Sequence, residues 1–591
     1  MIKGGEFLIT DQKSNDIFIP EEFTEEQKMM ASATTEFVEK ELDPHRERFE
    51  KKDYKLTEDC MKKAGELGLL GIGVPTEYGG MGMPFNTSVL ICDKISGANG
   101  SFSTAFGAHT GIGTLPILLY GDKQQRERYL PKLATGEWMG CYCLTEPGAG
   151  SDANSGKTKA VLTKDEKKYL LTGQKMWISN AGFADIFIVF ARIEDDKNIT
   201  CFIVEKTMEG ITLGEEEHKL GLNSSSTRQV FFNDVSVPSE NVLGGRGNGF
   251  KIAMNALNIG RIKLSAAVLD ACRRVIGLST KYSNERIQFG MPISKFGAIK
   301  QKLADMAVRT YVIESTTYRA GNDIEKNIEK LEKEGMNHQK AHLKGVEEYA
   351  IECSVVKVLG SETVQYCSDE GIQIYGGMGY STDTPMEAAY RDARIARIYE
   401  GTNEINRMLI VGMILKKAMK GELDIMGPAM KVSEELMSIP PFKNTNNNTL
   451  FAIEKEHLKK LKKAILMTAG KAAQHYAMEI EKEQEILINL ANMVIDVYAC
   501  ESAILRAEKL VSQNGEESAR HQINMSKLCL YSAIKSCQGA GEEVILSFTE
   551  GDEQRILLMG LKRFTKGYII NPKKLRRNIA NKLIEENRFC F

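Results

Sequence analysis

A single carboxylate, Glu400, stands where the sequence predicts a turn between two helices. Residues 385–397 lack Gly and Pro after the first position and carry arginines at helical spacing, which predicts the first helix. Gly401 is a stop signal, and Thr402 is a good N-cap for the apolar run that follows. A Glu in such a break can point into a cavity. If that cavity is dry, the pKa of the Glu rises towards the value that a general base needs near neutrality.

Two interpretations of Glu400 stay open at this level. Arg391, Arg394 and Arg397 would lower its pKa, so the net shift does not follow from the sequence. An isolated Glu is also more often an ordinary member of a polar turn than a catalytic group. The rest of the chain has to decide between these interpretations.

Two further segments carry groups that suit a planar ligand with polar edges. Residues 142–152 end a strand in a loop of small residues, where backbone N–H groups and hydroxyls could approach a ligand closely. Residues 175–180 place Trp177, one of two tryptophans, next to a hydroxyl residue. A rigid aromatic surface beside a hydrogen-bonding group suits a flavin ring. Taken alone, each segment is more often an ordinary strand and turn.

The elements that must position these residues change character three times along the chain. With 591 residues, 42% of them hydrophobic, the chain can bury several cores in three or four structural units. Helical periodicity gives way to short, branched or aromatic runs and then returns, which predicts a mostly α protein with a central β domain. The predicted domains are 1–138, helical; 139–248, β; 249–437, helical; a linker at 438–449; and 450–591, helical.

Composition excludes several classes of protein. The formal charge of −2 provides no overall basic field for nucleic acid. Twelve cysteines form no CxxC repeat and no even framework, so we expect reduced thiols, no disulfide scaffold and no metal site. Neither a signal or transit segment nor an apolar run long enough to span a membrane is evident. A cytoplasmic enzyme of a prokaryote is the expectation.

Taken together, these motifs strongly resemble the acyl-CoA dehydrogenase family. Residues 142–152 and 177–180 are similar to the two flavin-binding signatures of its middle domain. Residues 373–380, 391–392 and 399–402 are similar to its C-terminal signature, and the resemblance covers roughly 21–415 in the expected order. It implies a helical–β–helical fold that holds FAD in an extended form beside an acyl-CoA thioester. The implied reaction is α,β-dehydrogenation to the trans-2-enoyl-CoA, with electrons passed to electron-transfer flavoprotein.

The resemblance also assigns roles to residues. Glu400 would take the α-proton while the β-hydride leaves to flavin N5, and its backbone N–H would help to polarise the thioester oxygen. Some members carry the catalytic Glu on another helix, just before an Arg; the matching position here is Gly260, which cannot abstract a proton. The implied FAD contacts are Tyr142, Leu144, Thr145, Gly150, Ser151, Trp177, Ile178, Ser179, Arg286, Phe289, Phe296, Gln373, Ile374, Gly376, Gly377, Thr402, Asn403 and Glu404. The implied substrate contacts are Ser151, Asn258, Arg261, Tyr380 and Gly401.

Some of these contacts would come from a second subunit. Arg286, Phe289 and Phe296 resemble the segment that reaches the FAD diphosphate of a neighbour, and residues 373–377 would complete that site. A homo-oligomer, with a dimer favoured, follows from this resemblance. The glycine-rich run at 244–249 lacks a βαβ context, so we interpret it as a loop into the next helix.

Chain-length preference is a weaker inference. Medium-chain members close the acyl pocket with bulky polar side chains, and Thr104 and Ala108 stand at those positions here. A deeper pocket could bury more methylenes, each worth roughly 0.8 kcal/mol. Very-long-chain members also carry an added C-terminal helical domain, which is associated with dimers and with membranes.

Basic clusters in the added domain leave peripheral membrane contact open, although such charge runs usually only solvate a helix face. The clusters are Lys459–Lys460, Lys462–Lys463 and the basic residues of 573–577. Two alternative functions also remain: an acyl-CoA oxidase that uses dioxygen, and a non-catalytic assembly or scaffold protein.

Overall fold

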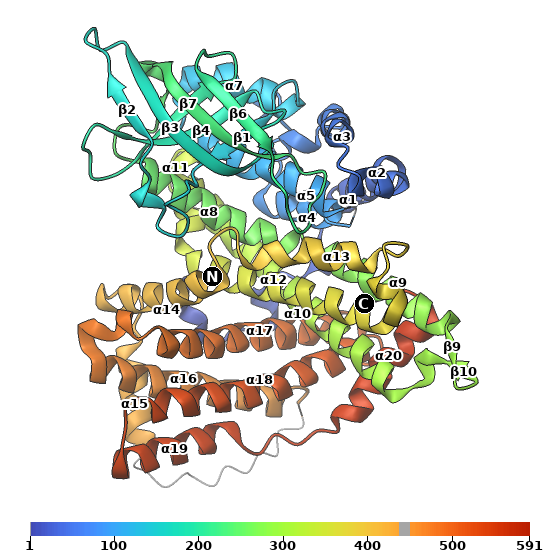
Figure 1. Cartoon of the computed structure of the whole chain (residues 1–591). Helices are drawn as coiled ribbons and strands as arrows, with labels where there is room; N and C mark the ends of the chain where they lie inside the picture. The colour runs from blue at the N-terminus through green and yellow to red at the C-terminus, as the bar shows by residue number, and fades with distance from the viewer. Residues whose placement is uncertain (1, 98, 437–448) are drawn as a thin grey trace.

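The computed structural model describes residues 2–97, 99–436 and 449–591. Within them, a β domain forms one end of the molecule, long helices fill the middle, and a further group of helices forms the other end (Figure 1). The prediction of a mostly helical protein with a central β domain and an added helical domain is confirmed. Most of the predicted linker at 438–449 lies outside the described residues.

The N-terminal helices begin with a capping box. Thr24 Oγ1 accepts a hydrogen bond from the Gln27 N–H, and the Gln27 side chain accepts one from the Thr24 N–H, which fixes the start of α1. The helices of this region are α1 (Glu25–Phe37), α2 (Arg46–Glu50), α3 (Tyr54–Glu66), α4 (Phe85–Ile95), α5 (Gly100–Gly107), α6 (Leu115–Tyr120) and α7 (Lys123–Thr135). The wider π-helical segment η8 (Ala108–Gly113) continues α5.

The β domain is an eight-stranded sheet in the order β6-β7-β3-β2-β4-β5-β8, with β1 paired in parallel to β4. Nearly every residue of β4 and β5 is buried, with Phe187, Val189 and Phe202 packed inside the β domain, as the branched and aromatic runs predicted. The strands are β1 (Gly140–Cys143), β2 (Lys159–Leu162), β3 (Lys168–Ser179), β4 (Ile186–Ile193), β5 (Thr200–Glu205), β6 (Ile211–Glu216), β7 (Thr227–Pro238) and β8 (Val242–Leu243). The glycine-rich run after β8 is a loop into the next helix, as expected.

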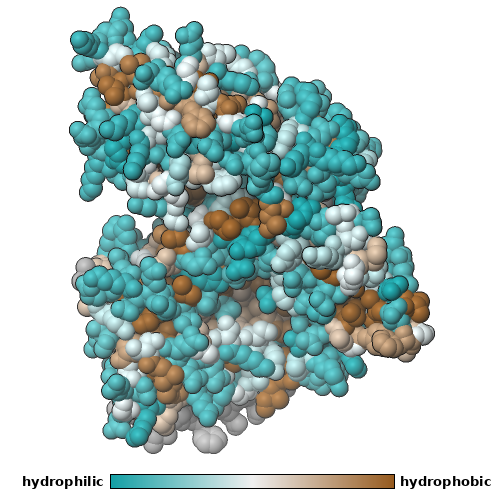
Figure 2. Space-filling model, viewed as in Figure 1, coloured by the Kyte–Doolittle hydropathy of each residue, from teal (hydrophilic) through white to brown (hydrophobic). Residues whose placement is uncertain are grey.

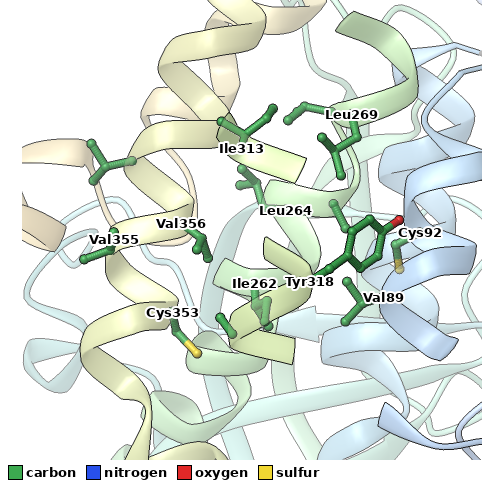
Figure 3. Close-up of a cluster of buried hydrophobic side chains, with 14 of the residues drawn as sticks. Val89, Cys92, Ile262, Leu264, Leu269, Ile313, Tyr318, Cys353, Val355 and Val356 are labelled. Carbon is green, nitrogen blue, oxygen red and sulfur yellow. The ribbon is translucent and has the colours of Figure 1, made fainter. Parts of the chain in front are cut away.

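The middle helical bundle packs around α8 and α12. Figure 3 shows buried side chains of α4, α8, α10 and α12 meeting there, among them Val89, Ile262, Ile313 and Val356. The helices are α8 (Gly249–Ala266), α9 (Leu269–Glu285), α10 (Gly297–Lys333), α11 (His338–Glu348), α12 (Ala350–Tyr375), α13 (Met386–Ala393) and α14 (Asn403–Met419). A two-stranded hairpin, β9 (Ile287–Gln288) and β10 (Met291–Pro292), projects between α9 and α10 (Figure 1).

The added C-terminal domain is built around α17, whose apolar side chains are largely buried. Its helices are α15 (Met426–Leu436), α16 (Ala452–Tyr476), α17 (Gln484–Asn514), α18 (Arg520–Leu546), α19 (Gly551–Thr565) and α20 (Pro572–Glu586). Buried ion pairs join this domain to α10: Arg506 contacts Glu314 at 2.7 Å, and Arg319 contacts Glu501 at 2.6 Å. A second group of ion pairs links Glu314 through Arg273 to Asp93 of α4.

The N-terminal arm, residues 2–23, crosses the helical bundle and the added domain. The Gly5 N–H donates to Glu352 of α12 at 2.8 Å, and Lys509 of α17 donates to the Ile17 carbonyl at 2.7 Å. Phe7 of the arm packs against Tyr498 of α17. The arm is therefore held both by the middle helical bundle and by the added C-terminal domain.

Two described helical segments are long and apolar enough to span a membrane by composition alone. They are Gly249–Glu285 and Gln484–Asn514, and 72% and 78% of their apolar windows are buried inside the protein. Burial at this level is what core helices of a large bundle show, so the apolarity of both segments is explained by packing.

Candidate active site

Glu400 lies in the turn between the 3₁₀ segment η13 (Arg394–Arg397) and α14, as predicted. The Thr402 hydroxyl accepts a hydrogen bond from the Ile405 N–H at 3.2 Å and caps α14. Glu400 has a φ of 58° and Gly401 a φ of 79°, so both residues are in the left-handed region. A non-glycine residue held in that conformation is strained, and such strain persists only where the surroundings enforce it.

Three buried side chains from three helices hold the carbonyl groups of this turn. Arg261 of α8 donates to the Glu400 carbonyl at 3.3 Å, and Lys357 of α12 donates to the Gly401 carbonyl at 2.7 Å. Asn406 of α14 donates to the carbonyls of Glu400, Gly401 and Thr402 at 3.3, 2.8 and 3.0 Å. The strained turn is thus fixed from its carbonyl side, which leaves the Glu400 side chain free to face elsewhere.

The Glu400 carboxylate faces Gly260 of α8. A Cβ atom at Gly260 would stand 2.6 Å from Glu400 Oε2, so only glycine fits at this position without displacing the carboxylate. Oε2 is buried and has no hydrogen-bond partner in the described part of the chain. Burial raises the pKa of Glu400 to about 7, against the opposing charges of Arg261 and Lys357. The carboxylate therefore has the proton affinity of a general base near neutrality.

A channel of about 470 Å³ opens in front of Glu400. One wall follows α8 and α9 through Gly260, Leu264, Ala267, Ala271 and Val275, which recur at helical spacing. The facing walls come from α5 with η8 and from α13. Their small side chains include Thr104, Ala108, Gly111, Ala389 and Ala393. At the far end, Arg274 and Asp43 form an ion pair of 2.7 Å.

The edge of the β domain supplies a second set of groups. A bulge in β3 between Lys175 and Ile178 gives Trp177 a φ of 59° and turns its side chain outward, 51% exposed. Ser179, at the end of the same strand, lines the channel that holds Glu400. Tyr142 of β1 is buried, and its hydroxyl has no partner among the described residues. Tyr142 and Ser179 therefore lie near the Glu400 carboxylate, and the exposed Trp177 stands two residues before Ser179 on the same strand.

Models of known families match nearly the whole described chain. The N-terminal, middle and C-terminal domain models of acyl-CoA dehydrogenase match residues 24–137, 141–235 and 247–415, and a further C-terminal domain model of the same family matches 460–563. A probable acyl-CoA dehydrogenase of Bacillus subtilis (strain 168) is 44% identical over 99% of this chain and 98% of its own.

The chain belongs to the acyl-CoA dehydrogenase family. A crystal structure of an acyl-CoA dehydrogenase complexed with FAD from Bacillus anthracis superposes with a TM-score of 0.97 at 42% identity and covers 100% of both chains. The very long-chain specific acyl-CoA dehydrogenase of Homo sapiens is 37% identical over 77% of this chain and 70% of its own. This acyl-CoA dehydrogenase is a flavin-dependent oxidoreductase, and its cofactor is FAD.

The geometry of the β-domain edge fits FAD. Leu144 and Thr145 follow β1, and the loop after them leaves open space around Gly148 and Gly150, where a Cβ would meet no atom within 4 Å. Trp177 offers an exposed aromatic face. A buried ion pair of 2.6 Å between Glu146 and Lys175 anchors this loop to β3, so the loop is held in place before any ligand binds.

Two of the predicted FAD contacts, Ile178 and Asn403, have buried side chains that a ligand cannot reach directly. Ile178 is buried in the β core, so only its backbone can reach a cofactor. The Asn403 side chain is buried, accepts a hydrogen bond from Lys357 at 2.8 Å and donates to Ser361 at 3.0 Å. Glu404 and Ser151, by contrast, are exposed.

Other predicted residues lie away from Glu400 within one chain. Arg286 and Phe289 are exposed on the β9–β10 hairpin, with Phe289 91% exposed, and Phe296 packs against Phe289. Gln373 is exposed in the last turn of α12, and Gly376 and Gly377 are exposed just after that helix, whereas Ile374 is buried. Tyr380 is 87% exposed and does not line the channel. One copy of the chain does not bring these residues together with the β-domain edge.

Two predicted substrate contacts have a defined place beside the turn. Asn258 and Arg261 are buried, and Arg261 donates to the Asn258 side chain at 2.7 Å as well as to the Glu400 carbonyl. Arg261 is therefore not a surface charge, because the residue is only 4% exposed. Its predicted contact with CoA stays a prediction.

Sequence reasoning missed Lys357 and Asn406, which position the catalytic turn. The one signal for Lys357 is its place among the apolar residues Val355, Val356 and Val358 of a helix, where a cation needs a buried acceptor. Burial lowers the pKa of Lys357 to about 7, against the attraction of Glu400. Asn406 offers no comparable signal, because a polar residue in the first turn of a helix is common.

Proposed function

We propose that this acyl-CoA dehydrogenase converts acyl-CoA to trans-2-enoyl-CoA in fatty acid β-oxidation, with Glu400 as the base that removes the α-proton. The observation that carries the proposal is the Glu400 carboxylate. It faces the channel beside Gly260, its pKa is raised to about 7, and its Oε2 is buried without a hydrogen-bond partner among the described residues. A merely structural Glu would be paired or solvated.

The chain's own groups account for the proton-transfer half of the reaction. Bound FAD supplies the acceptor for the β-hydride at its N5 position. The Glu400 N–H has no acceptor in the described part of the chain, so it is available to the thioester oxygen. A donor preorganised in this way stabilises the negative charge that develops as the α-proton leaves, by roughly 3–4 kcal/mol. Arg261, Lys357 and Asn406 keep the donor and the base in one fixed turn.

The channel supports a long acyl chain. Its wall runs from Gly260 to Leu278 along α8 and α9, which is roughly 27 Å by helical rise. An extended sixteen-carbon chain, roughly 20 Å long, fits within that length. Thr104 and Ala108 line the channel and leave it open, as the sequence predicted. We therefore propose a preference for long-chain substrates.

A homodimer is the proposed assembly. The apolar side chains of the β9–β10 hairpin, Ile287, Phe289 and Met291, are 52%, 91% and 42% exposed and form an apolar patch at the edge of the molecule (Figure 2). Exposed apolar surface of this kind is characteristic of an interface. In a dimer the hairpin would bring Arg286 to the FAD of the other subunit, where its guanidinium could bind phosphate oxygens.

Electron-transfer flavoprotein is the proposed electron acceptor, and the cytoplasm of a prokaryote is the proposed location. Peripheral membrane contact has less support. Lys462 is buried against Glu501, Lys463 pairs with Glu435, and Arg576 pairs with Asp305, so these members of the basic clusters already have partners within the protein. Paired cations add little to attraction towards anionic lipid.

Anaerobic titration of the purified flavoprotein with palmitoyl-CoA tests the proposal. Bleaching of the flavin absorbance in the wild type, and its loss in Glu400→Gln, is the expected result. Added electron-transfer flavoprotein should restore the colour faster than dioxygen does; the reverse would favour an acyl-CoA oxidase. A bound flavin that palmitoyl-CoA and shorter acyl-CoA thioesters all fail to bleach would favour a scaffold role.

A further inference from the structure

A second cavity, the side chamber, adjoins the acyl channel. It has a volume of about 250 Å³, and Cys92, Phe106 and Lys263 line both it and the channel. Most of its other walls are apolar, with Leu70, Ile91 and Ile259 among them. The side chamber is therefore a branch of the acyl-binding space that the proton-transfer chemistry at Glu400 does not use.

Lys263 is the cationic group at the junction of the two cavities. It lies on α8, one helical turn beyond Gly260, and therefore beside the face that lines the channel. In the described part of the chain its ammonium makes no hydrogen bond and no ion pair. Burial lowers the pKa of Lys263, and the neighbour that acts against this is the Cys92 thiol, which burial keeps in its neutral form by raising its pKa.

The other polar groups of the side chamber do not neutralise Lys263. The His342 ring is close to it, but burial holds the pKa of His342 at about 3, so the ring is neutral, and its Nδ1 has no partner. The carboxylates on the chamber wall are engaged elsewhere: Glu325 accepts from the Asn86 N–H at 2.8 Å, and Glu332 contacts His338 at 2.7 Å. The remaining carboxylate of that wall, Glu329, pairs with Lys333 at 3.7 Å.

An ammonium without a counter-charge inside a largely apolar cavity is costly, by several kcal/mol per ion in general. A ligand that brought a carboxylate to this point would remove that cost, and a plain alkyl chain would not. We propose that Lys263 binds the terminal carboxylate of an ω-carboxyacyl chain, so that CoA monoesters of dicarboxylic acids form a second substrate class. This inference rests on the proposed function of the Glu400 channel.

The position of Lys263 sets the length of such a substrate. Lys263 follows Gly260 by three positions on α8, and Gly260 faces the catalytic carboxylate. Given the length of a lysine side chain, the ammonium lies within roughly 10 Å of that carboxylate. That span suits chains of medium length, such as suberyl-CoA and sebacyl-CoA. Long unsubstituted chains would instead follow the channel past Leu264 and Val275.

The test is a change of specificity in the holoenzyme. Wild type, Lys263→Met and a control, Lys251→Met, which alters an exposed lysine of the same helix, are compared by kcat/KM and by anaerobic flavin bleaching with suberyl-CoA and octanoyl-CoA. For Lys263→Met we expect kcat/KM to fall about tenfold or more with suberyl-CoA, because a charge-assisted hydrogen bond is lost, and to rise with octanoyl-CoA. The control should keep the wild-type ratio of the two substrates.

Three outcomes would overturn the inference. The first is an unchanged ratio of suberyl-CoA to octanoyl-CoA activity in Lys263→Met. The second is a wild-type enzyme that palmitoyl-CoA bleaches and no dicarboxylic monoester does, which would leave the proposed function intact. The third is failure with every acyl-CoA, which would overturn the proposed function as well. Activity with octanoyl-CoA also shows that Lys263→Met is folded, and Lys263→Gln provides a second variant if it is not.

Discussion

Glu314 and Glu400 are two glutamates in the helical part of this protein. The pKa of Glu314 lies below the ordinary value for Glu, and the pKa of Glu400 lies above it. Burial would raise the pKa of Glu314, but Arg506 and Arg273 contact its carboxylate directly and lower the pKa to about 2. Burial raises the pKa of Glu400 to about 7, because Arg261 and Lys357 contact the backbone of its turn and not its carboxylate. The carboxylate of Glu314 is paired directly with arginines and contributes to stability. The carboxylate of Glu400 has no such partner among the described residues and keeps the raised pKa that a base needs.

The two sites also make opposite contributions to the pH dependence of stability. The pKa of Glu314 is lowered, so its contribution is complete above the ordinary Glu value of 4.5 and is lost as the pH falls towards 2. The pKa of Glu400 is raised, so the unfolded chain gives up this proton first and stability declines as the pH rises from 4.5 to about 7. The catalytic carboxylate therefore destabilises the fold at the pH where it works.

The largest expected effect comes from removing the unpaired carboxylate. Glu400→Gln keeps the shape of the side chain and loses the base, so the rate of flavin reduction by palmitoyl-CoA should fall by about a thousandfold or more. The same variant should unfold at a higher temperature than the wild type above neutral pH, because no buried charge remains. Glu422→Gln, at an exposed carboxylate, is the control for both measurements. Rapid bleaching in Glu400→Gln would mean that another group is the base.

Breaking the paired site should affect stability and spare catalysis. Arg506→Met leaves Glu314 and Glu21 without this guanidinium inside the protein, and loss of one partner of a buried pair costs about 3–5 kcal/mol. The midpoint of denaturant unfolding should fall accordingly, whereas Arg520→Met, at an exposed pair, should leave it nearly unchanged. Equal midpoints in the two variants would show that the buried pairs contribute little.

Filling the space at Gly260 should weaken catalysis without removing the base. The added methyl group of Gly260→Ala would stand 2.6 Å from Oε2 and 2.8 Å from Cδ of Glu400, so the carboxylate must move. A displacement of this size can cost about a hundredfold in kcat. Gly412→Ala is a matched control, because that helical glycine of α14 has open space around it. Similar kcat values for both variants would show that the carboxylate can shift without loss.

The smallest expected effect is a shift in pH dependence. The rate of flavin reduction should rise with pH as Glu400 ionises, with a midpoint of about 7. Lys357→Met removes a cation that lowers the pKa of Glu400, so the midpoint of the pH–rate curve should move to higher pH. Lys416→Met, at an exposed lysine of α14, should keep the wild-type profile. A profile in Lys357→Met that moves to lower pH or stays in place would exclude an electrostatic role for Lys357.

The sequence predicted the features that depend on neighbouring residues. Thr402 caps α14 through a hydrogen bond to a residue three positions away, and such a local pattern can be recognised in the sequence alone. The position of Glu400 in a turn followed from the same kind of signal. Family resemblance then supplied the identity of the flavin loop, which no local pattern could have given.

The acidity of Glu400 could not be predicted, because the charges that surround it come from distant parts of the chain. The arginines close to it in sequence suggested an opposing charge, yet Arg391 pairs with Glu387 and Glu50. The cations that lower the pKa are Arg261 and Lys357, which α8 and α12 bring to the turn. The space at Gly260 is likewise a property of packing between two helices.

The N-terminal arm has a consequence for how the chain folds. The hydrogen bond from Lys509 to the Ile17 carbonyl joins residues 492 positions apart, and the Lys462 bond to Thr10 joins residues 452 apart. The arm is synthesised before α16 and α17, so it waits for these helices before it finds its partners. Closing so large a loop is slow, and the helices of the middle bundle can assemble earlier from nearer contacts. Docking of the arm should thus be among the last steps of folding, after the ribosome has made most of the added domain.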